Sequence, residues 1–350
     1  MPYDRERAMR RNADFITDPH KTGVLIRVTG FGPIELPESD PLEAFDLPRE
    51  INKYCDQAIE RYLRFREAHD RFDDDWIPAL KPYLGIAEHS CFLGGEVTYG
   101  GNTSYHHPAI DDINDWKKLS VNINTPHYRA LLDGMAYFKE RSEHYGYFSA
   151  LRGGDGPMDI ANAVRGNDLL YDFYDEPDTA AEFVDFCAKA AAWTFDNQYP
   201  LASVVNGGYI SGMTTWMPAG SIGHLSEDAS CLCSPTMYER FGLPYTSKLL
   251  ENYSYAMMHV HSLGRACIPI IARMEKIGTF QLSGDPKQPT AIAIYKEYAD
   301  LFSGRSVLLN MTPDEITENL GFLKGRKTII NLEASSPEEA ERILDMVRGV

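Results

Sequence analysis

The chain of 350 residues carries 34 basic and 51 acidic side chains, which gives a formal net charge of −17 at neutral pH. This excess of negative charge repels phosphate backbones and anionic membranes, so we expect neither a nucleic-acid partner nor a membrane partner. Apolar residues make up 43% and charged residues 24% of the chain, which is typical of a globular protein with a sizeable core. We recognise no membrane span and no signal peptide, and we predict a cytoplasmic protein.

In the N-terminal third of the chain, the sequence pattern predicts helices and one strand, followed by an unusually long loop. Residues 1–23 are expected to form a helical extension, followed by a strand at residues 24–28 and a long helix at residues 48–72. Residues 78–119 are rich in glycine, proline and aromatic side chains and have little regular period. Because such loops are usually functional or contain short elements, we expect this loop region to lie over a cleft.

From residue 125 onward, short apolar strands alternate with helices. Strands are predicted near residues 147–150, 201–205, 229–232, 255–258, 279–282, 306–309 and 328–332. Helices are predicted near residues 126–145, 177–199, 235–252, 263–276, 290–302, 313–323 and 337–347. Strands separated by helical patterns of this length indicate a parallel sheet. Roughly eight such units predict an α/β fold, a single (β/α)8 barrel of the TIM type that spans residues 1–350.

His259 and His261 stand two residues apart where the predicted strand at residues 255–258 ends. In an extended backbone, residues i and i+2 project from the same face. Neutral imidazole is the commonest protein ligand for zinc, so the pair predicts two ligands of a metal site at the mouth of the barrel. The alternative is that the two rings cap backbone carbonyls or line a polar pocket.

Other strand ends should share this mouth with the histidines. The residues expected there are Arg152, Asp155, Asn206, Glu227, Asp228, Asp285, Asn310 and Glu333. Tyr209 and Trp216 belong to a polar, aromatic segment that we interpret as a loop over the substrate pocket. The carboxylates of Glu227, Asp228 and Asp285 are candidates for general acid and base, or for orienting a ligand histidine. For Glu227 and Asp228, which we place before the strand at residues 229–232, a helix or turn cap is the alternative.

Several segments together resemble the uroporphyrinogen decarboxylase superfamily, in particular its corrinoid-linked methyltransferase and decarboxylase-like members. They are residues 154–161 (GDGPMDIA), 171–177 (YDFYDEP), 227–230 (EDAS), 243–245 (LPY) and the His259-x-His261 pair. The resemblance implies a TIM-type barrel whose cleft lies at the C-terminal ends of the strands. The resemblance covers most of the chain from about residue 125 onward, where all of these segments lie.

Methyltransferase relatives hold a catalytic zinc with a His-x-Cys pair and a distant cysteine on the last strand. His259 matches the histidine of that pair, whereas His261 stands where the family has cysteine. Residues 329–334 (IINLEA) contain no cysteine, and Glu333 is the nearest side chain there that can bind a metal. We therefore expect His259, His261 and Glu333 to bind a divalent metal, zinc by resemblance, with an open fourth position.

The resemblance implies metal-dependent methyl transfer on a small substrate, linked to a thiol or to a corrinoid. No D-x-H-x-x-G corrinoid-binding motif occurs, so a corrinoid would come with a separate partner protein. Homodimers are common in the family, and we expect one by analogy. Arg152, Asp155, Asn206, Tyr209, Trp216 and Asn310 are the expected substrate contacts. Two alternatives stay open: a metal-independent decarboxylase or hydrolase that uses the cleft carboxylates, and an inactive binding barrel.

Overall fold

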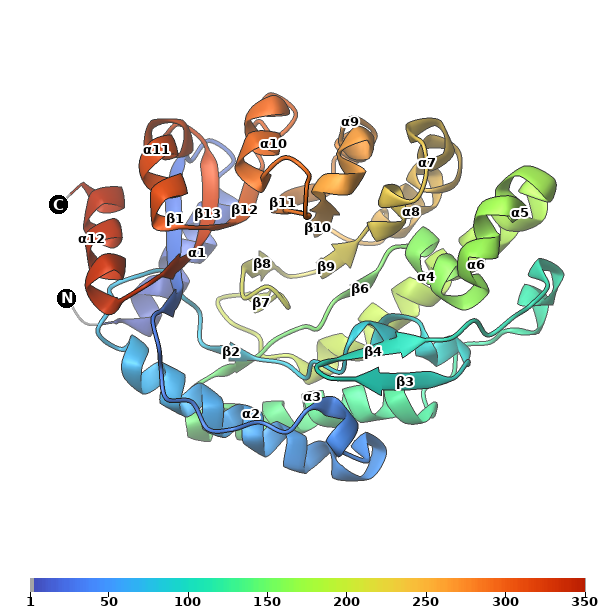
Figure 1. Ribbon diagram of the computed structural model, residues 1–350, viewed down its shortest axis with the longest axis horizontal. Coiled ribbons are helices and arrows are strands. Elements are labelled where there is room, and N and C mark those ends of the chain that lie inside the picture. Colours follow the sequence, from blue (N-terminus) through green and yellow to red (C-terminus); the bar gives the residue numbers. More distant parts are fainter. Residues whose placement is uncertain (1–2, 350) are drawn as a thin grey trace.

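The computed structural model of the chain describes residues 3–349. Its main sheet contains seven strands in the order β1-β13-β12-β11-β10-β9-β6, and all neighbours in it are parallel. The strands are β1 (Gly23–Phe31), β6 (Gly154–Asp155), β9 (Ser221–Ser226), β10 (Tyr255–His261), β11 (Ile277–Ser283), β12 (Ser306–Met311) and β13 (Lys327–Ala334). The strands curl into an arc with helices around the outside (Figure 1), which makes the fold a barrel-like α/β fold.

The remaining arc of the barrel is made by short segments. Strand β2 (Ala79–Leu80) pairs in parallel with β5 (Phe148–Ser149), which lies a few residues before β6. The segment before β2 is joined to β1 by one backbone hydrogen bond, from Asp75 N to Ile26 O at 2.8 Å, and by two carboxylates. Asp75 Oδ2 accepts from Ile26 N at 3.0 Å, and Asp74 Oδ2 accepts from Val28 N at 2.7 Å. The parallel α/β architecture is therefore confirmed, while the hydrogen-bonded sheet stays open between β1 and β6 over the described residues.

Twelve helices, counted over residues 3–349, accompany the strands. They are α1 (Arg5–Thr17), α2 (Leu47–His69), α3 (Pro126–Tyr145), α4 (Pro157–Arg165), α5 (Leu169–Asp175), α6 (Pro177–Gln198), α7 (Pro235–Phe241), α8 (Leu243–Leu250), α9 (Ile268–Ile271), α10 (Ala291–Glu297), α11 (Pro313–Lys324) and α12 (Pro337–Arg348). Many begin with proline, which has no N–H to leave unsatisfied in the first turn. Within the described residues, no helix is long and apolar enough to cross a membrane.

The two faces of the strands belong to two different cores. Ala256, Met258 and Val260 of β10 pack in the large core that also contains residues of the surrounding helices. Met257 points the other way, into a smaller core that it shares with side chains of β1, β12 and β13. His259 and His261 continue the face of Met257, because side chains alternate along a strand. The interior of the barrel is thus apolar near the start of β10 and polar at its end.

A hairpin of β7 (Gly208–Ile210) and β8 (Trp216–Pro218) fills the apolar part of this interior. Figure 1 shows it inside the arc of strands. Ile210, Trp216 and Met217 pack in the smaller core, and the buried Arg27 of β1 donates from Nη1 to the carbonyl of Thr214 at 2.7 Å. The hairpin precedes β9, so it occupies the end of the interior where the parallel strands begin.

Two of the strand predictions are wrong. Residues 229–232 belong to a 3₁₀ helix (Asp228–Cys231) and its end, and the true strand β9 lies just before them. Residues 201–205 follow another 3₁₀ helix (Tyr199–Leu201) and lead into the hairpin β7–β8. The sequence of β9, SIGHLS, is buried throughout although only two of its residues are strongly apolar. Burial in the barrel wall outweighs local composition here.

Other predictions need smaller changes. The helix expected at residues 263–276 is divided into a 3₁₀ helix (Ser262–Cys267) and the short α9. The long loop at residues 78–119 contains β2, two 3₁₀ helices (Ile86–His89 and Cys91–Leu93), the hairpin β3 (Val97–Gly100) to β4 (Thr103–His106), and a further 3₁₀ helix (Ile113–Lys118). The strands predicted at residues 24–28, 255–258, 279–282, 306–309 and 328–332 are confirmed.

Candidate metal centre

His259 is oriented by a side chain of the neighbouring strand. The register of β10 and β11 places His259 beside Gln281, whose Oε1 forms a short hydrogen bond with His259 Nδ1. Gln281 Nε2 donates to the Leu282 carbonyl at 3.2 Å, which fixes the amide with its oxygen toward the histidine. His259 Nδ1 therefore carries the proton, and Nε2 keeps a free lone pair.

His261 is oriented in the same sense by a carboxylate. Its Nδ1 lies 2.7 Å from Asp285 Oδ1, and Asp285 Oδ2 accepts from the backbone N–H of Leu263 at 2.7 Å. Although desolvation acts to raise the pKa of Asp285, the hydrogen bonds from Leu263, His261 and Ser262 hold that pKa below its ordinary value. Asp285 is thus an acceptor, His261 Nδ1 donates to it, and His261 Nε2 is left free.

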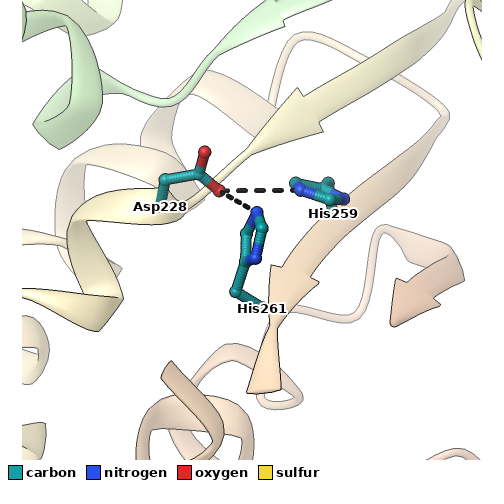
Figure 2. Close-up of side chains that lie close together, drawn as sticks. All are labelled: Asp228, His259 and His261. Atoms are coloured by element: carbon teal, nitrogen blue, oxygen red, sulfur yellow. Dashed lines mark ion pairs between the residues drawn. The ribbon is translucent and has the colours of Figure 1, made fainter. Parts of the chain in front are cut away.

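Asp228 completes the group. Figure 2 shows its carboxylate between the two imidazoles, with Oδ1 at 3.7 Å from Nε2 of His259 and 3.7 Å from Nε2 of His261. Asp228 follows β9, whose Ser226 pairs with His259. Its backbone N–H donates to Asp159 Oδ2 at 2.8 Å, so α4 holds the turn that carries the carboxylate.

This donor set fits a divalent metal. One ligand atom from each of Asp228, His259 and His261 can be chosen so that all three lie within 4.8 Å of one another. Ligands bound to zinc at about 2.0–2.2 Å in a tetrahedron are roughly 3.3–3.6 Å apart, close to the two Asp228–histidine distances. Both histidines also have the hydrogen-bonded Nδ1 that metal-binding imidazoles almost always show. Two imidazoles and a carboxylate suit zinc, iron and manganese.

Glu333 is not part of this group, so the ligand set expected from the sequence needs correction. Glu333 lies on β13 opposite Gly30, and β11 and β12 separate that strand from β10. On the intervening strand β12, Asn310 accepts a hydrogen bond from Asn331 Nδ2 at 2.8 Å. The carboxylate beside the histidines comes instead from β9, the direct neighbour of β10.

Glu227 and Asp228 make different contacts, and both follow β9 instead of preceding a strand. Glu227 is fully buried, and its Oε1 accepts from the Thr246 hydroxyl at 2.6 Å. Burial raises the pKa of Glu227 to about 7. This contact holds the carboxyl of Glu227 against α8, and Glu227 is not in the group of ligand atoms formed by Asp228 and the two histidines. The catalytic role expected for Glu227 stays a prediction.

A cavity of about 360 Å³ adjoins the centre and is rich in carboxylates. Asp155, Asp159 and Asp228 line it, and the long loop region contributes Ser90 and His106 among others. Burial, followed by the charge of Asp228, raises the pKa of Asp155 well above its ordinary value. Asp155 therefore keeps its proton to higher pH than an ordinary carboxyl, and in that form it can donate a hydrogen bond or a proton to a molecule in this cavity.

Buried basic groups adjoin the centre as well, and the sequence singled out only Arg152 among them. Arg152 is 4% exposed and forms an ion pair with the buried Glu88. His224 of β9 has its ring centroid 5.5 Å from that of His259, and neither of its ring nitrogens has a hydrogen-bond partner within the described residues. Burial first, and then the charge of Arg152, lowers the pKa of Lys81 to about 7.

Asn206, Tyr209 and Trp216 are not brought to the centre. Asn206 occupies a turn with φ of 50°, and Tyr209 packs on Tyr199 with ring centroids 5.3 Å apart. Trp216 is 3% exposed and donates from Nε1 to the Val205 carbonyl at 2.8 Å. All three precede β9 in the chain, whereas the metal centre lies where the strands end.

Comparisons with known proteins identify a related fold but no family. No described protein family matches the sequence, and no curated protein matches it either. Among solved structures, a methyltransferase from Methanosarcina mazei is similar over 97% of this chain and 97% of its own, with a TM-score of 0.60 and 14% sequence identity. At this identity the likeness shows a shared fold along the whole chain.

Proposed function

We propose that the chain is a metal-dependent enzyme that transfers a methyl group to or from a small substrate, with Asp228, His259 and His261 as its metal ligands. The observation that carries the proposal is the convergence of two free imidazole nitrogens on one carboxylate oxygen, at 3.7 Å from each. Zinc is the metal we favour. When bound, it would act as a Lewis acid that activates a thiol or a water molecule.

The reaction type is supported by two likenesses. The similar structure from Methanosarcina mazei is a methyltransferase, and its fold extends over 97% of this chain. The sequence segments described above resemble corrinoid-linked methyltransferases of the uroporphyrinogen decarboxylase superfamily. A closed (β/α)8 barrel is part of the same proposal. The corrinoid would be delivered by a separate protein, because the chain has no corrinoid-binding motif of its own.

Residues around the ligands have distinct proposed roles. Asp285 and Gln281 hold the Nδ1 protons of the two histidines and so direct both Nε2 atoms to one point. His224 has two unpartnered ring nitrogens beside His259 and can bind a polar group of the substrate. The raised pKa of Asp155 favours its protonated form beside Asp228, and the buried Arg152 can orient a negative substrate group.

A metal-independent decarboxylase is the second candidate. The raised pKa of Asp155 favours it, because a buried acid that keeps its proton to higher pH than an ordinary carboxyl can protonate a carbanion left by loss of carbon dioxide. In this proposal Asp155 takes the acid role instead of Glu227, whose buried carboxyl accepts from the Thr246 hydroxyl. Asp228 and Asp285 would then form the acidic surroundings without a bound metal.

Metal content separates the two candidates. We expect untagged wild-type protein, purified without chelators, to contain about one equivalent of zinc, iron or manganese by mass spectrometry, and a His259→Ala/His261→Ala double variant to contain none. A His20→Ala/His144→Ala variant, which removes two exposed histidines, is the matched control and should keep the metal.

Activity is then measured as methyl transfer from free methylcobalamin to a panel of small thiols. The wild type and the control variant should be active and the double variant inactive. If the wild type takes up no metal even after incubation with each ion, the metalloenzyme proposal is wrong and decarboxylation becomes the leading candidate. If the wild type binds the metal but transfers no methyl group, the proposed metal centre stands and the proposed reaction is wrong.

A further inference from the structure

A second cavity, of about 330 Å³, lies outside the metal centre. It is formed where α2 and α3 begin and where the chain passes between them, and none of its lining residues lines the acidic cavity. Its wall is largely apolar, with contributions from Phe45, Leu47, Val97 and the ring of Tyr99. Its size is within the range of about 300–1,000 Å³ that is usual for small-molecule sites.

The start of α3 leaves hydrogen-bond donors in this cavity without acceptors. Thr125 is the N-cap residue, yet its hydroxyl makes no capping hydrogen bond, and the buried Oγ1 has no partner within the described residues. The first backbone N–H groups of a helix have no acceptor inside the helix. Helix α3 has 20 residues and no acidic side chain in its first turn to offset its positive end, whereas the first turn of α2 contains Glu50. The positive end of α3 at this cavity favours a negatively charged ligand.

His127 supplies a second, independent pointer. It lines the cavity, is only 3% exposed, and its Nε2 has no hydrogen-bond partner within the described residues. Its Nδ1 lies 2.6 Å from the Tyr99 hydroxyl, and the two rings stack with centroids 5.4 Å apart. With Nδ1 accepting from the tyrosine, Nε2 carries the proton and becomes a donor. A buried donor without an acceptor costs free energy that a ligand would recover.

One carboxylate, that of Asp46, belongs to the cavity lining as well. Its Oδ2 lies 3.0 Å from Arg49 Nη1, and both side chains are exposed. This ion pair offsets the negative charge at the rim. Among the described residues, the side-chain donors of Thr125 and His127 inside the cavity have no acceptor.

We propose that this cavity is a binding site for a small monocarboxylate with an apolar tail. The carboxylate accepts from the Thr125 hydroxyl, His127 Nε2 and the first amides of α3, while the tail packs on Phe45, Leu47 and Val97. The segment that carries Cys91 into this cavity also carries Ser90 into the acidic cavity. A ligand here therefore contacts the same short segment that shapes the metal centre.

The test uses hexanoate as the probe, with hexanamide and hexylamine as matched neutral and cationic compounds, in calorimetric titrations of the full chain. Hexanoate should bind, and hexanamide should bind about tenfold more weakly or not at all, because hydrogen bonds to a charged group are the stronger ones. Equal affinity for hexanamide, a preference for hexylamine, or no hexanoate binding at millimolar concentration would each overturn the proposal.

Three variants locate the site. Thr125→Val removes the hydroxyl at nearly constant shape and should weaken hexanoate about tenfold with little change in melting temperature, because Thr125 makes no capping bond. Val97→Trp fills the cavity and should abolish binding. The His259→Ala/His261→Ala variant should bind hexanoate as the wild type does. Binding that survives in Thr125→Val and Val97→Trp but disappears in the histidine variant would assign the carboxylate to the metal centre instead.

Discussion

Two histidine–aspartate pairs in this protein have nearly the same geometry and different surroundings. His69 Nε2 lies 3.0 Å from Asp74 Oδ2, and both side chains are fully buried. His261 Nδ1 lies 2.7 Å from Asp285 Oδ1 in a partly exposed setting. The two pairs differ at the other ring nitrogen of each histidine. Nδ1 of His69 has no partner within the described residues, and the ring packs among aromatic side chains. Nε2 of His261 faces Asp228.

The difference teaches how to recognise a functional pair. In the His69 pair, Asp74 also accepts from the backbone N–H groups of Val28 and Trp76, so the carboxylate holds β1 to the chain before β2. In the His261 pair, Asp285 fixes a ring whose other nitrogen converges with two further ligand atoms. A histidine bonded to a carboxylate indicates a metal site only when its remaining nitrogen meets other donors.

The largest expected effect is on stability, at the structural pair. Asp74→Ala leaves the N–H groups of Val28 and Trp76 and the His69 ring without their buried acceptor. Removing one partner from such a buried network costs about 3–5 kcal/mol, which denaturant unfolding would measure. Metal affinity of the folded variant should be unchanged. Loss of the metal with stability unaltered would reverse the roles assigned to the two pairs.

A third buried histidine sharpens the comparison, because His127 has neither a carboxylate nor a metal ligand beside it. Burial lowers the pKa of His127 from 6.5 to about 4, so the folded chain takes up this proton less readily than the unfolded chain. The stability that this neutral histidine provides is complete above pH 6.5 and is lost as the pH falls toward 4. One pKa unit corresponds to about 1.36 kcal/mol, which makes the loss about 3 kcal/mol.

The measurement is the free energy of unfolding of the wild type and of His127→Gln at several pH values between 7.5 and 4. The glutamine can keep a hydrogen bond to Tyr99 but does not titrate. The difference between the two proteins should change by about 3 kcal/mol across this range. A difference that stays constant with pH would mean that His127 takes up its proton equally readily in the folded and the unfolded chain, so that burial does not lower its pKa.

Asp228 and Glu333 provide a matched test of the metal ligands. Asp228→Asn removes a charged ligand and should weaken zinc binding by more than about 100-fold, because changes one shell further out already cost 10–100-fold. Glu333→Gln also replaces a carboxylate with an amide, on β13, and should leave the zinc affinity unchanged. Competition with a chromogenic chelator measures the zinc affinity of both variants. The opposite ranking would restore the ligand set expected from the sequence and exclude the one proposed from the structure.

The smallest expected effect concerns the orientation of His261. Asp285→Asn keeps an oxygen for His261 Nδ1 but removes the negative charge, so zinc affinity should fall by about 10–100-fold. The unfolding free energy should change far less than in Asp74→Ala, because Asp285 is partly exposed. If Asp285→Asn destabilised the fold as strongly as Asp74→Ala and left zinc binding intact, the two pairs would be equivalent structural pairs.

Much of the fold could be predicted from the sequence because strands such as β11 and β13 are rich in apolar and β-branched residues. The pairing of His259 with His261 on one face followed from the period of a strand, and it holds. The segment SIGHLS did not read as a strand, so β9 was displaced to residues 229–232. The predicted strand therefore begins after Asp228, although Asp228 in fact follows a strand. His224 lies within the true strand β9, so it is not among the predicted site residues.

The third ligand shows what a local pattern cannot supply. Glu333 is expected only from the resemblance to methyltransferases that hold a ligand on the last strand, whereas Asp228 stands beside the histidines because β9 and β10 are direct neighbours. Strand order is set by contacts between distant parts of the chain. The hairpin that carries Trp216 was expected over the pocket for a similar reason: its polar, aromatic composition does not reveal which end of the barrel it fills.

The pairing of β1 with β13 has a consequence for synthesis of the chain. Thr29 of β1 donates a hydrogen bond to Leu332 of β13, 303 residues later in the sequence. At a translation rate of about 5–20 residues per second, β1 leaves the ribosome roughly 15–60 seconds before its partner exists. During that time one edge of an apolar strand stays unpaired, and such edges invite aggregation. Until the last strand emerges, this edge of β1 lacks the partner that it has in the folded chain.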